Sequence, residues 1–279
     1  VAVRKTDVNS LPKTEEYKGI VQNKKIRSLP IIRGVFSFID SMVLGMSTLT
    51  YSASFFMDEE EEEKDEKKES VMMGLTIACS VVMAVAIFMI LPYFLSQLFR
   101  KFTDSTTLIT LLEGAVRLVI FFGYILLISR MKDIQRVFMY HGAEHKCINC
   151  IEHGMELNVE NVLKSSRLHK RCGTSFLFIV MIVSIIFFLF IRIESPIWRV
   201  VFRLLLIPVI AGVSFEFIRL AGKSENKLVI LLSKPGMMLQ KLTTREPDAS
   251  MAEVAIASVE AVFDWRAYLK ENFGWQEKV

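Results

Sequence analysis

Apolar residues gather in four long blocks, at about residues 71–97, 107–129, 173–193 and 198–221. Each block has about the 20 residues or more that an α-helix needs to cross the hydrocarbon core of a bilayer. A chain inside a bilayer must satisfy its backbone hydrogen bonds internally, so each block is predicted to be a transmembrane helix. The pattern predicts an all-α integral membrane protein with about four transmembrane helices, in two pairs spanning 71–129 and 173–221.

A fifth apolar stretch, residues 30–57, is diluted by Asp40 and by many serines and threonines. We interpret it as an interfacial or membrane-packed helix, with a further transmembrane helix as the alternative. It is followed by an acidic linker over 58–70, where the run DEEEEEKDEKKE is too charged to pack against anything apolar.

Three polar segments complete the chain: 1–29, 130–172 and 222–279. The first is predicted to be a short extended or hairpin segment. In the last, 227–242 is predicted to be an amphipathic surface helix interrupted at Pro235-Gly236. Ser250 to Glu253 fits a capping box that opens a soluble helix ending near Phe263. Four transmembrane helices would place all three polar segments on one side of the membrane.

Basic residues favour the cytoplasm as that side. The central segment carries Arg130, Lys132, Arg136, Lys146, Lys164, Arg167, Lys170 and Arg171, whereas the links on the opposite side offer Arg100, Lys101, Arg192 and Arg199. In a reducing cytoplasm the cysteines are expected as thiols or metal ligands rather than disulfides.

Composition supports the membrane assignment. The chain is 52% hydrophobic, and its mean hydropathy of +0.39 excludes an ordinary soluble domain. The net charge is +4, but the basic residues form no stripe with interleaved aromatics, so no nucleic-acid partner is expected. The lipid bilayer is the predicted partner.

Histidine and cysteine are concentrated in the central segment. It holds all four histidines and three of the four cysteines: His141, His145, His153, His169, Cys147, Cys150 and Cys172. These side chains bind zinc and similar divalent metals well at neutral pH. A helix continuing out of the second transmembrane block would place His141 and His145 on one face, one turn apart. Glu144 completes the motif H-x-x-E-H, in which the glutamate polarises water in zinc peptidases.

A second pattern overlaps the first. Cys147 and Cys150, followed after eighteen residues by His169 and Cys172, have the spacing of a structural zinc knuckle. One tetrahedral metal cannot take every candidate. Either the histidine pair recruits His169, Cys172 or an acid such as Glu152, or the thiols close a structural site. A hydrogen-bonded cluster without metal and a Cys147/Cys150 redox pair are the further alternatives.

The second transmembrane block contains two ionisable residues, Glu113 and Arg117, at i and i+4. This spacing allows an ion pair that offsets the cost of burial. The pair is expected either to fix helix packing or to line a polar cavity leading toward the histidine cluster.

Three sequence blocks resemble the YqhQ-like bacterial membrane proteins, a family of unknown function whose members are predicted metal-dependent enzymes. The blocks are YHGAEHK (140–146), LHKRCGTSF (168–176) and LTTREPD (242–248), the last followed by EVAIA. The resemblance covers nearly the whole chain. The family usually has proline at the place of Lys170 and opens with a glycine-rich segment that this sequence does not show.

The resemblance implies a bacterial cytoplasmic membrane and a set of matching positions: His141, Glu144, His145, Lys146, Glu152, His169, Arg171 and Cys172. The family pattern does not require cysteine at 147 and 150. The resemblance therefore favours a metal site of His141, His145 and His169, with Cys172, over the zinc knuckle.

Two functions follow as hypotheses. The first is a zinc-dependent hydrolase that acts on membrane-associated substrates, with Glu144 as general base and Lys146 or Arg171 stabilising the oxyanion. The second is a non-catalytic factor in membrane-protein assembly or quality control, with a translocon or membrane protease as partner and a structural His/Cys cluster. A transporter is less favoured, because the ligand-rich segment lies outside the apolar blocks and no internal repeat is visible.

Overall fold

The computed structural model describes residues 2–3, 13–14, 28–54, 66–191, 193, 195–224 and 226–276. Within these ranges the regular secondary structure is helical except for two short antiparallel strands, β1 (Ala2–Val3) and β2 (Lys13–Thr14). The helices are α2 (Ile32–Ser54), α3 (Glu66–Val85), the π-helix η2 (Ala86–Ile90), α4 (Leu91–Gln97), the 3-10 helix η3 (Leu98–Lys101), α5 (Thr106–Ile128), α6 (Lys132–Glu152), α7 (Val159–Lys164), α8 (Gly173–Phe190), α9 (Pro196–Lys223), α10 (Lys227–Thr243), α11 (Ala249–Glu260) and α12 (Trp265–Phe273).

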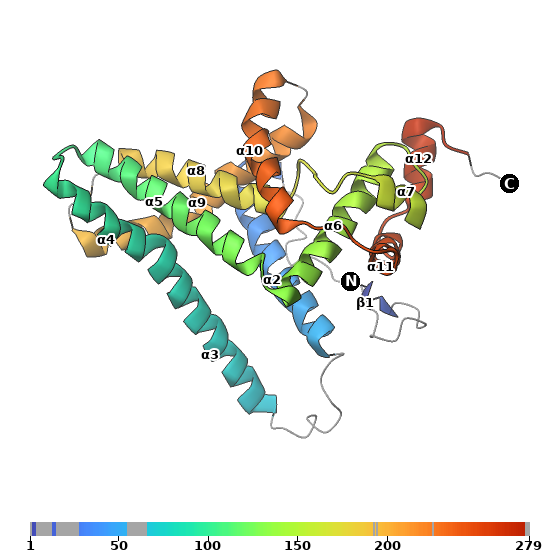
Figure 1. Ribbon diagram of the computed structural model, residues 1–279, viewed down its shortest axis with the longest axis horizontal. Helices are drawn as coiled ribbons and strands as arrows, with labels where there is room; N and C mark the ends of the chain where they lie inside the picture. Colours follow the sequence, from blue (N-terminus) through green and yellow to red (C-terminus); the bar gives the residue numbers. More distant parts are fainter. Residues whose placement is uncertain are drawn as a thin grey trace.

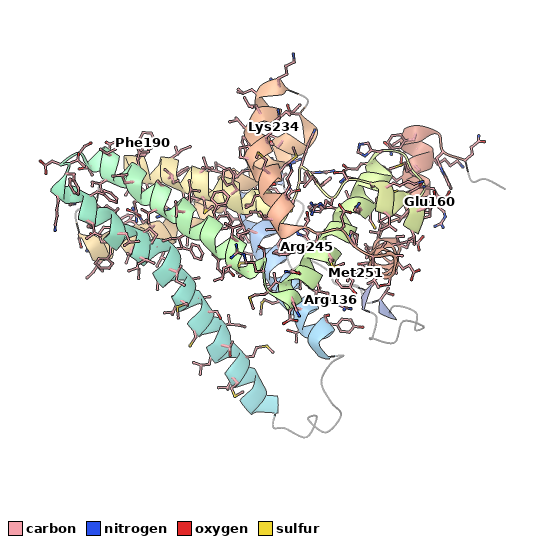
Figure 2. The ribbon with its side chains drawn as sticks, viewed as in Figure 1. Arg136, Glu160, Phe190, Lys234, Arg245 and Met251 are labelled. Carbon is pink, nitrogen blue, oxygen red and sulfur yellow. The ribbon has the colours of Figure 1, made fainter. Side chains whose placement is uncertain are left out.

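Among the described residues, five helical stretches are long and apolar enough to cross a membrane: Ile32–Ser52, Val71–Lys101, Thr106–Ile128, Gly173–Phe190 and Ile197–Gly222. Many of their large apolar side chains are exposed, as a lipid-facing helix would require; Phe190 is 82% exposed at the end of α8 (Figure 2). The all-helical fold is therefore compatible with the predicted membrane protein.

Helix α2 packs along α9 and is also long and apolar enough to cross a membrane, so it suits both the packed helix and the further transmembrane helix considered for 30–57. The contact is close at Gly34, where an added Cβ would lie 2.8 Å from the carbonyl oxygen of Gly212. Arg33 and Glu216 form an ion pair beside it. Helix α3 behaves differently: it extends away from the other helices, and its apolar stretch has no buried residues (Figure 1).

A turn separates α5 from α6, so the predicted single helix running out of the second apolar block is wrong. Helix α5 ends at Ile128 and α6 begins at Lys132, which redirects the chain (Figure 1). The side-chain amide of Gln135 donates to the carbonyls of Ser129 and Arg130, each at 3.2 Å. These bonds satisfy groups that a continuing helix would have paired.

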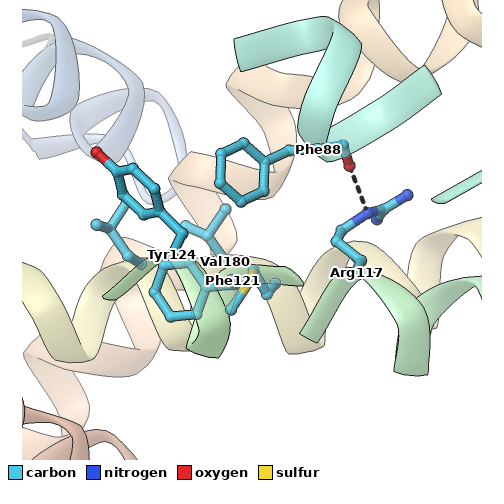
Figure 3. A pocket seen from close by; sticks show the side chains of 7 residues that line it. Phe88, Arg117, Phe121, Tyr124 and Val180 are labelled. Carbon is cyan, nitrogen blue, oxygen red and sulfur yellow. Dashed lines mark hydrogen bonds between the residues drawn. The ribbon is translucent and has the colours of Figure 1, made fainter. Parts of the chain in front are cut away.

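Arg117 is placed by the helix irregularity around Pro92. A proline has no N–H, so the carbonyl four residues earlier, that of Phe88, loses its usual helical donor. Arg117 Nε donates to this carbonyl at 3.0 Å (Figure 3). Its Nη2 binds Glu113 at 2.9 Å, so the predicted pair forms, and Arg203 binds the same carboxylate. This arrangement joins α5, α9 and the irregular segment.

Helix α6 leaves the apolar helices and packs with α7, α11 and α12 around a small core (Figure 1). Trp265 and Leu269 of α12 and Val162 of α7 are almost fully buried in it. Helix α11 is capped by Asp248, which accepts from Met251 N, so the predicted capping box at Ser250 is wrong. Helix α10 continues through Pro235, so the predicted interruption there is wrong as well.

Candidate metal centre

Three side chains of the types that bind metals converge where α6 meets the start of α8. His141 and His145 lie one turn apart on α6, and Cys172 immediately precedes α8. One ligand atom from each lies within 4.8 Å of the others. The two imidazole rings are 4.4 Å apart, and His141 Nε2 lies 3.3 Å from the Cys172 sulfur. The predicted i, i+4 histidine pair thus shares one small volume with a thiol.

Backbone carbonyls hold both imidazoles in one tautomer. His141 Nδ1 lies 2.9 Å from Thr243 O, and His145 Nδ1 lies 2.7 Å from Arg167 O. A carbonyl oxygen can only accept, so each Nδ1 carries a proton and each Nε2 is left for the cluster: protonated, it donates to the Cys172 thiolate, and deprotonated, it offers a lone pair. Metal-bound histidines in proteins are oriented in this way by a partner on their other nitrogen.

The surroundings of Cys172 favour the ionised form of its thiol. Burial alone would raise its pKa, but hydrogen bonds and charge from His141 and His145 lower the pKa to about 5. The backbone N–H of Thr174, in the first turn of α8, also donates to this sulfur at 3.3 Å. Burial works to lower the pKa of His141, yet its contacts with Cys172 outweigh burial and raise it. The thiolate is the form that binds metals.

Gly142 lets the segment 243–245 pass directly against α6. A Cβ at this position would lie only 2.1 Å from the carbonyl oxygen of Arg245. Arg245 N donates to Phe138 O at 2.9 Å, which fixes the segment in place. The close approach brings the Thr243 carbonyl to His141, so the absence of a side chain at Gly142 helps to position the site.

His169 lies near the cluster, with its ring centroid 5.9 Å from that of His145, but its side chain contacts other residues, and it is outside the group of three ligand atoms. Its Nε2 contacts Glu152 at 3.1 Å, and its Nδ1 accepts from Arg171 N. Glu152 also pairs with Arg171. Gln240 clamps the His169 backbone, accepting from its N–H at 2.9 Å and donating to its carbonyl at 2.8 Å. His169, Glu152 and Arg171 therefore form an ion-paired group beside the metal candidate.

The other two predicted catalytic residues differ in their surroundings. Lys146 is 4% exposed and donates to the carbonyls of Leu163 and Ser165 while pairing with Glu246 at 2.9 Å, a set of contacts that favours a structural role. Glu144 is exposed on α6, and its charge contributes to raising the pKa of His141. It lines a cavity with Glu152 and Arg171.

Cys147 and Cys150 point into the small core, so the structure does not assemble the predicted zinc knuckle. Both side chains are fully buried among residues such as Ala252 and Leu269. Burial raises the pKa of Cys147 to about 12 and that of Cys150 to about 11. They belong to the face of α6 that packs on α7 and α11, and neither joins the group formed by the described ligands. A low-pKa redox pair is unsupported for the same reason.

A largely apolar cavity of about 550 Å³ opens beside the cluster. His141, Arg171 and Cys172 form its polar end, and side chains from α2, α8 and α9 form its walls, among them Phe38 and Phe215. Phe38 and Phe176 narrow it, with ring centroids 5.9 Å apart. The cluster thus faces a space bordered by three of the long apolar helices.

Sequence reasoning missed the residues that orient the site. Thr243 and Arg167 act through backbone carbonyls, which carry no signal of residue type. Gln240, Thr243 and Thr244 are polar residues that the structure buries almost fully. The signal available in the sequence was this group of polar residues at the end of an amphipathic helix.

Comparison with known proteins places these features in a family. Residues 29–265 match the family described as "Protein of unknown function (DUF1385)". The chain is 35% identical over 286 residues to "Uncharacterized protein YqhQ" of Bacillus subtilis (strain 168), covering 97% of this chain and 88% of that protein. No solved structure matches the chain.

Proposed function

The chain belongs to the DUF1385 family of proteins of unknown function, and we propose that it is a membrane-embedded, metal-dependent hydrolase. His141, His145 and Cys172 would hold zinc or a similar divalent metal. The observation that carries the proposal is the convergence of three ligand atoms with both imidazoles oriented by backbone carbonyls. Three protein ligands leave a tetrahedral metal one open position, which is the arrangement of catalytic rather than structural zinc.

The donor set fits zinc because imidazole nitrogen and thiolate sulfur are its preferred ligands. Bound there, the metal supplies a Lewis acid that polarises a carbonyl and activates water near neutral pH. The low pKa of Cys172 supports this role, since little energy is then needed to deprotonate the ligand.

The largely apolar lining of the cavity supports an apolar substrate. We expect an apolar chain or peptide segment to lie between Phe38 and Phe215, with its reactive group directed to the polar end at His141 and Cys172. Arg171 borders this cavity as well as the one that contains Glu144. In the proposed reaction Arg171 stabilises negative charge that develops on the substrate oxygen, and Glu144 takes up the proton from water.

The test separates metal binding from chemistry. Glu144→Gln removes a carboxylate that is outside the ligand group, so zinc should remain near one equivalent while hydrolysis of a fluorogenic long-chain ester falls at least roughly a hundredfold, the scale of general-base catalysis. The matched control is Glu160→Gln, an exposed carboxylate on α7 paired with Lys164, which should change neither. Full turnover in Glu144→Gln would remove Glu144 from the mechanism. A zinc-free wild type after zinc supply would overturn the whole proposal.

A non-catalytic role in membrane-protein assembly is the second candidate, and α3 favours it. The apolar stretch of this helix has no buried residues and extends away from the rest of the molecule (Figure 1). A surface of this kind suits a partner helix as well as lipid. Stoichiometric co-purification of another membrane protein, lost on replacing exposed α3 residues such as Val82 by serine, would support this role.

A further inference from the structure

A further cavity, of about 520 Å³, lies at the opposite end of α5 from the turn into α6. It is bordered by the end of α4 and η3, the first turns of α5, the chain after α8 and the first turns of α9. The residues that line it are Tyr93, Gln97, Arg100, Thr106, Ile109, Thr110, Glu113, Ile191, Ile193, Arg199 and Arg203. It shares no residue with the cavity beside the histidine cluster.

The charge of this cavity is unbalanced. Three guanidinium groups line it, from Arg100, Arg199 and Arg203, against the single carboxylate of Glu113. That carboxylate is 3% exposed and is already shared, because Arg203 Nη2 and Arg117 Nη2 each donate to it at 2.9 Å. Two positive charges therefore remain among the lining residues: Arg203 is buried, Arg199 is half-buried and Arg100 is exposed at the rim.

Neither Arg100 nor Arg199 forms an ion pair with a carboxylate in the described part of the chain. Arg199 donates to the Ile193 carbonyl at 2.9 Å and lies over the ring of Tyr93. Arg100 donates to Gln97 Oε1 at 2.5 Å. The same Gln97 amide has a buried Nε2 without a hydrogen-bond partner among the described residues. An unsatisfied donor and two unpaired charges around one space point to a missing acceptor.

We propose that this cavity binds a phosphate group. A phosphate monoester carries nearly two negative charges at neutral pH and several strong acceptor oxygens, which match the two excess charges and the spare amide donor. Guanidinium groups bind phosphate through paired hydrogen bonds, and Arg203 is held in position by Glu113. The shared chemistry has two sources, a lipid headgroup or free phosphate. The apolar part of a lipid could contact Ile109, Ile191 and Ile193, which line the same cavity.

The experiment uses the full chain purified in phosphate-free detergent. One arm titrates inorganic phosphate calorimetrically, and the other measures retention of phosphatidic acid from mixed phosphatidic acid and phosphatidylcholine nanodiscs by mass spectrometry. The test variant is Arg100→Gln/Arg199→Gln, which leaves the Glu113 ion pairs intact. The control is Arg130→Gln/Lys132→Gln, the same charge change near the other end of α5.

Saturable binding in either arm, weakened at least roughly tenfold in the test variant and unchanged in the control, supports the proposal. The arm that saturates identifies the source. His145→Ala should bind as wild type does, which separates this cavity from the candidate metal centre. Absence of saturable binding in both arms, or equal weakening by the control, would overturn the proposal and leave the arginines as helix-packing residues.

Discussion

Two thiol environments on either side of α6 show what turns a cysteine into a candidate ligand. Cys147 and Cys150 lie on the face that packs into the small core, where burial raises their pKa to about 12 and about 11. Cys172 meets the opposite face, where His141 and His145 lower its pKa to about 5. All three are buried, so burial alone does not decide the state of the sulfur. The neighbouring imidazoles do.

The largest expected effect is a contrast in thiol reactivity. In zinc-stripped protein at pH 7, iodoacetamide should alkylate Cys172, which faces a cavity as a thiolate, and leave Cys147 unmodified until unfolding. With a pKa of about 12, only roughly one Cys147 thiol in 10⁵ is ionised at pH 7. The rate of alkylation at Cys172 should fall as the pH drops through about 5, because the pKa of this thiol is lowered in the folded protein and the thiolate is lost only there. Peptide mass spectrometry measures both sites.

A Cys79→Ser background removes the exposed thiol of α3 from this experiment. Added zinc should protect Cys172 and change nothing at Cys147. Equal labelling of the two thiols at pH 7 would show that the contrast between the environments is wrong.

The sequence predicted the parts of the fold that follow from chain hydropathy, and missed those that depend on single contacts. Long apolar blocks indicated the helices because a helix that crosses a membrane needs about 20 residues of mostly apolar composition. The break at 129–131 depends on Gln135 capping two carbonyls, and the cap of α11 on which of two neighbouring polar residues turns toward Met251. Such choices are made by local geometry that periodicity does not record.

The next largest effect is expected on stability and zinc binding when the close contact between α6 and the segment 243–245 is disturbed. Gly142→Ala should raise helix propensity by about 1 kcal/mol, but its Cβ would clash with the Arg245 carbonyl. Overpacking against backbone costs about 1–3 kcal/mol, so we expect a lower melting temperature and weaker zinc binding.

The matched control is Gly123→Ala on α5, where an added Cβ meets nothing within 4 Å. It should be neutral or slightly stabilising, and its zinc content should equal that of wild type. If Gly142→Ala retains wild-type stability and zinc, the close approach at Gly142 does not position the site.

The smallest effect distinguishes the two core cysteines from each other. Cys150 lies 3.3 Å from the Glu156 carbonyl, so the hydroxyl of Cys150→Ser finds an acceptor. Cys147 is fully buried among apolar side chains, so Cys147→Ser should lower the free energy of unfolding by about 1–2 kcal/mol more than Cys150→Ser does. Thermal unfolding of the two variants compares them directly. A larger loss for Cys150→Ser would contradict the assigned surroundings.

The candidate site was predicted in part, for a reason that follows from helix geometry. His141 and His145 were paired because i and i+4 share a face on any helix. The third ligand was not fixed by sequence, since Cys172 and His169 are both distant along the chain. Gln240 and Glu152 hold His169 aside, and these contacts arise only when α10 and α6 meet the loop before α8.

The central claim is that the histidine face of α6, and not its cysteine pair, binds the metal. Elemental analysis of detergent-purified protein, after zinc supply and removal of excess, tests it most directly. We expect about one zinc per chain in wild type and in Cys147→Ala/Cys150→Ala, and almost none in His145→Ala or Cys172→Ser. Zinc lost from the double cysteine variant and kept in His145→Ala would contradict the account.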